Sequence, residues 1–360
     1  MKVSPVSPSA AERWFQRFAA CVLGYLLLVI VFGAWVRITG SGAGCGAHWP
    51  SCQGELVPRS PSEATLIEYS HRLSSGLSGL AALVLPLWAF RVFPAGHAAR
   101  RWSLRTLLLV AVEGAIGAAL VKNRLVADDA SLARAIVVAL HLVNTLLLTA
   151  SATLTVVAAG RGENPHTSSS EGAARAPLLL IVLIGLGLVA ATGAVTALGD
   201  TLFPVPLSGG SAVAGSAGGG ALRPVADHFL VQLRVLHPVL ACGLVVAALG
   251  LAKLLASVPS VRPWALLLGG LALLQLVLGG VNVLLRAPGW LQLAHLLVAQ
   301  LLWISAVLAA QSFWRSGSAI SGSPISGSPI SRSPISRSPV PGGPAARGEA
   351  ARRSISRSNA

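Results

Sequence analysis

Four histidines of this sequence lie within long apolar segments, where ionisable side chains are costly and usually serve a function. Each lies a few residues inside an even-numbered apolar segment, at His71, His141, His237 and His295. At about 1.5 Å per helical residue the four side chains lie at similar depth. Paired imidazoles from facing helices ligate haem iron, whereas mononuclear zinc needs three or four ligands together. The pattern therefore predicts two bis-histidine haem sites, one in each half of the chain.

Glu68 precedes His71 by three residues, so the two side chains share one helix face about one turn apart. A carboxylate beside a ligand can accept a proton during a reaction. The corresponding position before His237 is Arg234, so one half carries an acid where the other carries a base. Arg72 and Arg234 are candidates to pair with haem propionates. The alternative is that Glu68 and Arg72 are boundary residues extending to lipid headgroups, with His71 a hydrogen-bonded interior histidine.

The composition is that of a polytopic membrane protein. Of 360 residues, 54% are hydrophobic and 11% charged, and the mean hydropathy is +0.71. Eight apolar runs are long enough to cross a bilayer: 19–36, 69–90, 105–121, 133–158, 177–198, 228–251, 264–285 and 290–313. The predicted fold class is therefore all-α, with eight transmembrane helices.

An internal repeat divides the eight segments into two units of four. The same spacings, four and then seven residues, separate Glu113, Gly117 and Arg124 in the first unit and Gln275, Gly279 and Arg286 in the second. The predicted halves are residues 19–158 and 177–313. Because each half has an even number of helices, the two have the same orientation and a pseudo-twofold axis along the membrane normal.

The net charge of +15 indicates membrane orientation and not nucleic-acid binding. Basic residues concentrate in the loops on one side, which predicts that both termini are cytoplasmic and that the histidines lie near the outer face. Residues 1–18 form a predicted cytoplasmic leader. Residues 316–360 form a Pro/Ser/Arg-rich tail of a composition typical of disorder, whose charge suits anionic membrane lipid.

Cys45 and Cys52 lie seven residues apart in the first outward loop. An oxidising compartment allows a disulfide between them. A metal site that includes His48 is the alternative, although no fourth ligand is evident.

Several motifs together resemble those of heme A synthase. They are Gly33-x-x-Val36-Arg37-x-Thr39-Gly40-Ser41-Gly42, Cys45 followed by Trp49-Pro50-x-Cys52, Glu68-Tyr-x-His71-Arg72, and the three later histidines. The resemblance covers residues 19–313 and implies an eight-helix pseudo-twofold bundle in a bacterial inner membrane. It implies an oxidoreductase that converts a ring methyl of heme O to the formyl group of heme A, for assembly of haem-copper cytochrome oxidase.

The resemblance also implies residue roles. His71 and His141 would flank the substrate haem, while His237 and His295 would ligate a permanent heme b. Glu68 would be the acidic residue at the reacting centre, and the Cys45–Cys52 disulfide would lie near the substrate. Expected partners are heme O synthase, other oxidase assembly factors and a second copy of the chain. Glu113, whose repeat counterpart is Gln275, receives no catalytic role.

Two other classes of protein compete with this interpretation. A quinone-linked di-haem electron-transfer cytochrome shares the four histidines, but it needs neither a glutamate in one half only nor a cysteine loop. A transporter predicts broken helices and polar groups near the membrane midplane, whereas the polar groups here lie near one face.

Overall fold

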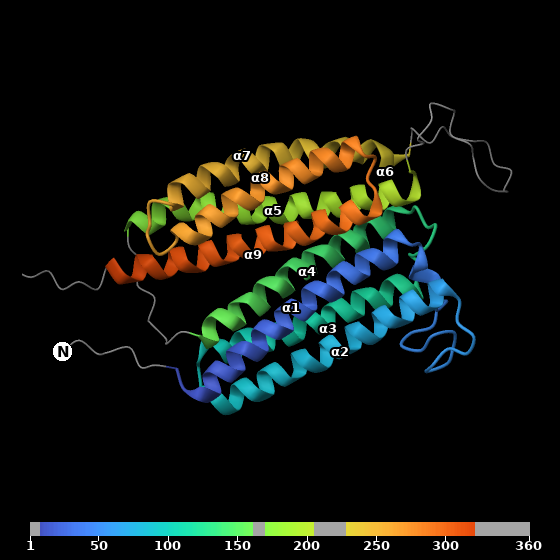
Figure 1. Cartoon of the computed structure of the whole chain (residues 1–360), viewed down its shortest axis with the longest axis horizontal. Coiled ribbons are helices and arrows are strands. Elements are labelled where there is room, and N and C mark those ends of the chain that lie inside the picture. Colours follow the sequence, from blue (N-terminus) through green and yellow to red (C-terminus); the bar gives the residue numbers. More distant parts are fainter. Residues whose placement is uncertain (1–7, 161–169, 205–227, 321–360) are drawn as a thin grey trace, which may run out of the picture. The chain divides into compact units, whose positions relative to one another are not determined.

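The described part of the chain is almost entirely helical. The computed structural model describes residues 8–160, 170–204 and 228–320. Its helices are α1 (Ala10–Ile38), η1 (Ser41–Ala43), α2 (Glu63–Val92), α3 (Ala98–Lys122), α4 (Leu132–Ala159), α5 (Ser170–Leu202), α6 (Phe229–Gln232), η3 (Leu233–Val235), α7 (Leu236–Leu255), α8 (Arg262–Leu284) and α9 (Gly289–Ile320) (Figure 1).

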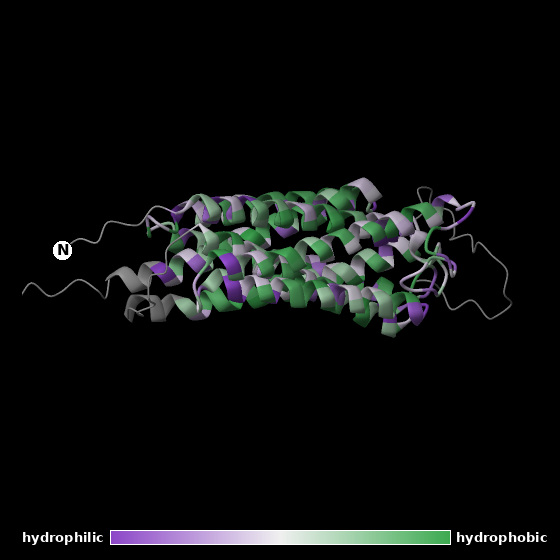
Figure 2. Cartoon of the chain, turned by 90° about the horizontal axis from the view of Figure 1, so that it is seen from below, coloured by the Kyte–Doolittle hydropathy of each residue, from purple (hydrophilic) through white to green (hydrophobic). Residues whose placement is uncertain are grey.

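Within the described ranges, eight helical spans are long and apolar enough to cross a membrane, with α6, η3 and α7 together forming one of them. No strand occurs in the described ranges, so the predicted class, an all-α polytopic membrane protein, is confirmed. Hydrophilic residues gather mainly near the helix ends and in the loops, and apolar residues cover the middle (Figure 2).

Two predicted boundaries were wrong because apolar runs mark the bilayer and not the ends of helices. α1 begins at Ala10, well before residue 19, because Ser9 and Glu12 form a reciprocal capping box. The second half of the predicted leader is therefore helical. α9 continues to Ile320, so the first residues of the predicted disordered tail are helical too. Residues 321–360 lie outside the described residues.

The helices form two groups. In the first, α1 contacts α2 and α4, and α3 contacts α2 and α4; in the second, α5 contacts α7 and α9, and α8 contacts α7 and α9. Each group has its own apolar core, with Phe15, Leu85 and Leu148 in the first and Leu179, Leu251 and Leu268 in the second.

The two groups also pack against each other within one unit, Met1–Gly322. α4 contacts α5 and α9, and α1 contacts α9. At the α4–α9 contact, Trp303 Nε1 donates to the Leu146 carbonyl at 2.7 Å. The buried Thr149 hydroxyl donates to Gln300 Oε1 at 3.2 Å. Side-chain hydrogen bonds therefore supplement apolar packing where the groups meet.

The sixth span is interrupted by the 3₁₀ turn η3 just before its histidine. Pro238 has no N–H to donate to the Arg234 carbonyl, and its ring crowds that carbonyl. A regular α-helix is therefore disfavoured at this point. The interruption distinguishes this span from α2, which is continuous through Glu68 and His71.

Candidate functional site

All four histidines line one cavity between the helices. Its volume is about 1970 Å³, and its lining includes His71, His141, His237 and His295 together with Glu68 and Arg72. Pockets for single small ligands usually measure about 300–1,000 Å³. The cavity is therefore large enough for two cofactor-sized molecules, and it is continuous between the two helix groups.

His237 and His295 face each other across this cavity. Their ring centroids are 6.4 Å apart and the ring planes are nearly perpendicular, at 86°. Two metal–nitrogen bonds of about 2.0 Å each, plus the reach from each nitrogen to its ring centre, span roughly 6 Å. His237 Nδ1 lies 3.1 Å from the Val189 carbonyl and 3.3 Å from the Thr192 hydroxyl. Donation from Nδ1 leaves Nε2 available to a metal, so this pair fits a haem iron.

Glycines on neighbouring helices make room for three of the imidazoles. An added Cβ at Gly193 would lie 2.9 Å from His237 Cε1, and one at Gly33 would lie 3.1 Å from His71 Cε1. An added Cβ at Gly279 would lie 3.3 Å from the His295 ring. The Gly33 and Gly193 positions correspond in the repeat, so both halves provide the same close approach for the histidine of their second span.

Glu68 is buried, with 3% of its surface exposed. Its Oε2 accepts a hydrogen bond from the Cys45 amide at 2.7 Å, and its Oε1 accepts one from Arg72. The alternative that Glu68 and Arg72 extend to lipid headgroups is therefore wrong, since both side chains are largely buried in an ion pair. The Nδ1 atom of His71 is buried and has no hydrogen-bond partner among the described residues, which does not favour the alternative of a hydrogen-bonded interior histidine.

The loop between α1 and α2 is joined to α2 by hydrogen bonds near His71. Cys45 and Cys52 form a disulfide, so the metal alternative with His48 is wrong. Arg72 donates to the carbonyls of His48 at 2.7 Å and Ser51 at 2.6 Å. The disulfide loop is thus held against the carboxylate, and its Trp49 and Pro50 line the cavity.

Arg234 takes a different partner in the second group. Its Nε lies 2.8 Å from Asp200 Oδ1, and its Nη2 donates to the carbonyls of Gly199 and Phe203. Arg72 and Arg234, both predicted to pair with propionates, line the cavity and are each already in an ion pair. The two halves therefore pair their charges differently. In the first half Glu68 and Arg72 pair within α2, and in the second half Arg234 pairs with Asp200 of α5.

Glu113 and Gln275 each contact the second histidine of their own half. Glu113 Oε1 lies 3.5 Å from His141 Nδ1. The Gln275 amide nitrogen lies 3.0 Å from His295 Nε2 and donates to the His295 carbonyl at 3.2 Å. The repeat therefore places one polar residue of the third helix against the histidine of the fourth, with a carboxylate in one half and an amide in the other.

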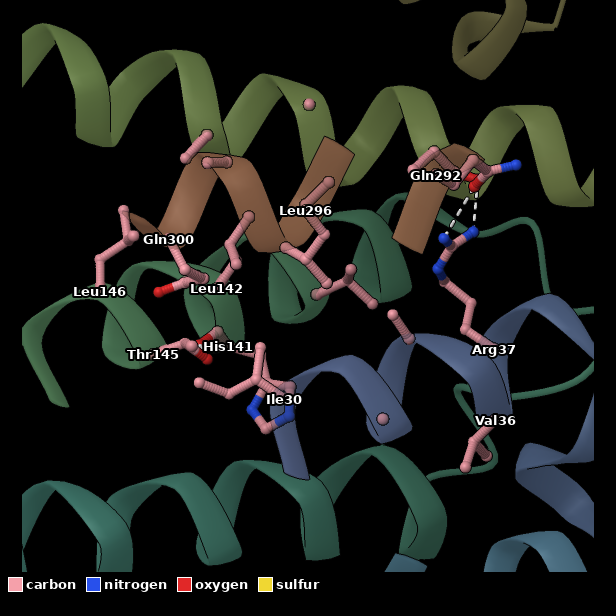
Figure 3. Close-up of a pocket in the computed structure, with 18 of the residues that line it drawn as sticks. Ile30, Val36, Arg37, His141, Leu142, Thr145, Leu146, Gln292, Leu296 and Gln300 are labelled. Atoms are coloured by element: carbon pink, nitrogen blue, oxygen red, sulfur yellow. Dashed lines mark hydrogen bonds between the residues drawn. The ribbon is translucent and has the colours of Figure 1, made fainter. Parts of the chain in front are cut away.

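Arg37 connects the two helix groups, whereas the sequence indicated it only as part of a motif and predicted no role for it. From the last turn of α1 it donates to Ala197 O at 2.7 Å, to the Thr201 hydroxyl, and to Gln292 Oε1 at 2.9 Å. Figure 3 shows Arg37 reaching Gln292 of α9, in the same pocket as His141. One sequence feature could have predicted a distant partner for Arg37: it is an arginine at the end of an apolar run with no acidic residue near it in the sequence.

The arrangement defines a class: a polytopic helical membrane protein with a duplicated four-span unit and histidine pairs around an internal cavity. Residues 16–307 match the family model COX15-CtaA, described as cytochrome oxidase assembly protein. The chain therefore belongs to this family, and the predicted resemblance to heme A synthase is confirmed.

Similar curated proteins carry two different names, protoheme IX farnesyltransferase and heme A synthase. The chain is 45% identical over 312 residues to a Thermus thermophilus protein named protoheme IX farnesyltransferase, covering 84% of this chain and 50% of that protein. It is 43% identical over 93 residues to heme A synthase of Alkalihalophilus pseudofirmus, covering 26% and 31% of the two chains. It is 37% identical over 138 residues to heme A synthase of Symbiobacterium thermophilum, covering 38% and 42%. The chain spans half the length, or less, of these curated relatives.

Proposed function

We propose that this protein is an oxidoreductase that converts heme O to heme A in cytochrome oxidase assembly. The observation that carries the proposal is an asymmetry between two otherwise similar halves. Both halves direct two histidines into the cavity, but among the described residues only the first half has a buried carboxylate, Glu68, one turn from a histidine. The second half has Arg234 at the position of Glu68, and its own carboxylate, Asp200, is paired with that arginine. A duplicated site that differs in this way suits a protein in which one copy reacts and the other holds a cofactor.

In this proposal His71 and His141 flank the substrate heme O in the first half. Conversion of the methyl to the formyl group adds one oxygen atom and removes four electrons, so it requires an oxygen source, such as water or dioxygen, and an electron acceptor from outside the chain. The protons released in these steps require a proton acceptor near the ring. Glu68 lines the same cavity as both histidines. Its hydrogen bond from the Cys45 amide and its ion pair with Arg72 hold the carboxylate in one orientation, and the disulfide loop covers it on one side.

His237 and His295 would hold a permanent heme b in the second half, and their 6.4 Å separation fits such a group. Heme b supplies one-electron redox chemistry when bound. The chain's own part is to orient the ligands: the Val189 carbonyl fixes His237 Nδ1, and Gly193 leaves space for the ring. Binding of iron at His295 Nε2 would replace the Gln275 contact there, and Gln275 would keep its bond to the His295 carbonyl.

The loops support a membrane orientation for this function. Basic residues concentrate on the side of the bundle where α1 starts and α9 ends. The positive-inside rule therefore assigns both termini to the cytoplasm. The histidines all lie within the first three turns of spans that start at the opposite end. Both haem sites and the disulfide would then lie near the outer face of a bacterial inner membrane, where disulfides persist.

The relative named protoheme IX farnesyltransferase indicates a partner and not a second activity. This chain aligns with 50% of that protein. The other half of that protein lies outside the match, and its name refers to the whole polypeptide. A farnesyltransferase acting on protoheme makes a prenylated haem of the kind that a heme A synthase consumes. We therefore propose a heme O synthase as the partner that supplies the substrate.

The proposal predicts that membranes of a heme O-producing host, free of other heme A synthases, contain heme A only when this chain is expressed. Acid–acetone extraction followed by chromatography measures the haems, and immunodetection confirms equal expression. The control is the same host expressing the His71→Ala variant. Abundant protein without heme A would contradict the proposal and favour the quinone-linked di-haem cytochrome.

A further inference from the structure

Glu113 is held in place by its neighbours on α4. Its Oε1 accepts a hydrogen bond from the Thr145 hydroxyl, and its Oε2 accepts one from the Asn144 amide. Asn144 and Thr145 are both buried, with 7% and 3% of their surfaces exposed. Because both carboxylate oxygens are already engaged, the carboxylate has a defined position on the α3–α4 contact.

This position brings the carboxylate to the ring of His141. His141 Nδ1 lies 3.5 Å from Glu113 Oε1 and makes no hydrogen bond within the described residues. An imidazole N–H that is buried without a partner is costly, and the carboxyl group of Glu113 is the acceptor beside it. Contacts of this kind are often long before a ligand binds and shorten afterwards.

The second half lacks this polar arrangement. The repeat counterparts of Glu113, Asn144 and Thr145 are Gln275, Val298 and Ala299. The amide of Gln275 contacts His295, but it carries no charge, and the two apolar residues cannot hold it as Asn144 and Thr145 hold Glu113. His141 and His295 also differ in their position relative to the third helix of their half. An added Cβ at Gly279 would lie 3.3 Å from His295, whereas one at the corresponding Gly117 would have no atom within 4 Å.

We infer that Glu113 is a positioning residue for His141: it accepts from Nδ1, fixes the ring orientation and makes Nε2 a stronger ligand for the substrate haem. This inference rests on the proposed function, in which His141 flanks that haem. Carboxylate partners of metal-bound histidines raise ligand basicity, and their removal weakens metal binding by about 10- to 100-fold. In the second half the counterpart Gln275 is neutral and contacts His295 at Nε2 and at the backbone carbonyl, so it does not assist Nδ1 of that ligand.

The test uses the purified full-length chain, with its second-half haem bound, titrated with heme O. The Glu113→Gln variant keeps the size of the side chain and removes its charge. We expect heme O to bind about 10- to 100-fold more weakly, and the reduction potential of that haem to rise because a nearby negative charge is lost. The content and potential of the second-half haem should stay unchanged. Thr145→Val, which removes one support of the carboxylate, should change affinity in the same direction and by less.

The repeat provides the matched control. Gln275→Glu places a carboxylate beside His295, and it should lower the potential of the second-half haem without changing heme O binding. If Glu113→Gln or Thr145→Val lowers only the melting temperature, with heme O affinity and both potentials unchanged, then Glu113 merely joins α3 to α4 and the inference is overturned.

The His141→Ala variant tests the proposed haem ligand separately from the positioning role of Glu113. Normal heme O binding by that variant would contradict the proposed ligand itself, whereas lost binding with an unaffected Glu113→Gln variant would contradict only the positioning role.

Discussion

Replacing His237 or His295 with alanine is expected to remove the heme b that we propose for the second half from the purified protein. The two rings are 6.4 Å apart across the cavity, so the loss of either leaves a haem iron with one protein ligand. We expect the low-spin absorbance of the second-half haem to disappear in both variants, and heme A formation with it. Absorbance spectra and haem quantification per protein measure the effect.

The matched control for these variants is His228→Asn. His228 caps α6 by accepting from the Leu230 amide, and asparagine is also a good helix cap. This variant should keep the complete haem spectrum. A His237→Ala/His295→Ala double variant that retained the second-half spectrum would refute the assignment of these ligands. His71→Ala and His141→Ala should instead impair turnover of heme O and keep the second-half haem.

Replacing Glu68 with glutamine is expected to reduce heme A formation by about 100-fold or more, the usual contribution of a general base. The glutamine can still accept from the Cys45 amide, but it cannot take up a proton from the substrate. The variant should still insert in the membrane, bind heme O and keep its second-half haem. Chromatography of the extracted haems measures the product.

The stability of the Glu68→Gln variant must be measured as well as its activity, because breaking a buried ion pair lowers the free energy of unfolding more than breaking an exposed one. The Glu68–Arg72 pair is buried, and removal of one partner from a buried pair can cost about 3–5 kcal/mol. Arg72 keeps its bonds to the His48 and Ser51 carbonyls in the variant, which limits the loss. Glu63→Gln, an exposed residue in the first turn of α2, is the control. Near-normal heme A from a folded Glu68→Gln protein would contradict the catalytic role.

The spans and the candidate residues were predictable because they depend on local composition. A run of about 20 apolar residues implies a membrane helix, and an ionisable group inside such a run is conspicuous. The repeat predicted which histidines correspond, and the structure brings all four to one cavity. The Cys45–Cys52 disulfide was predicted from a spacing and a compartment, and it is confirmed.

Contacts between distant segments were not predictable in the same way. Arg37 belongs by sequence to the end of α1, yet its partners Thr201 and Gln292 lie more than 160 positions further along the chain. The burial of Glu68 depends on a loop that folds back over α2, and the sequence alone favoured an exposed ion pair equally. The contact of Glu113 with His141 requires knowledge of the rotation of α3 about its own axis, which an apolar helix with weak amphipathicity does not reveal.

The most direct test of the account is an experimental density map of the protein purified from heme O-producing cells. We expect one planar haem between His71 and His141, with density for a prenyl chain, and a second haem without that chain between His237 and His295. The carboxylate of Glu68 should face the edge of the first haem. A haem bridging histidines of different halves, or a first pair that binds no haem in protein saturated with heme O, would contradict the account.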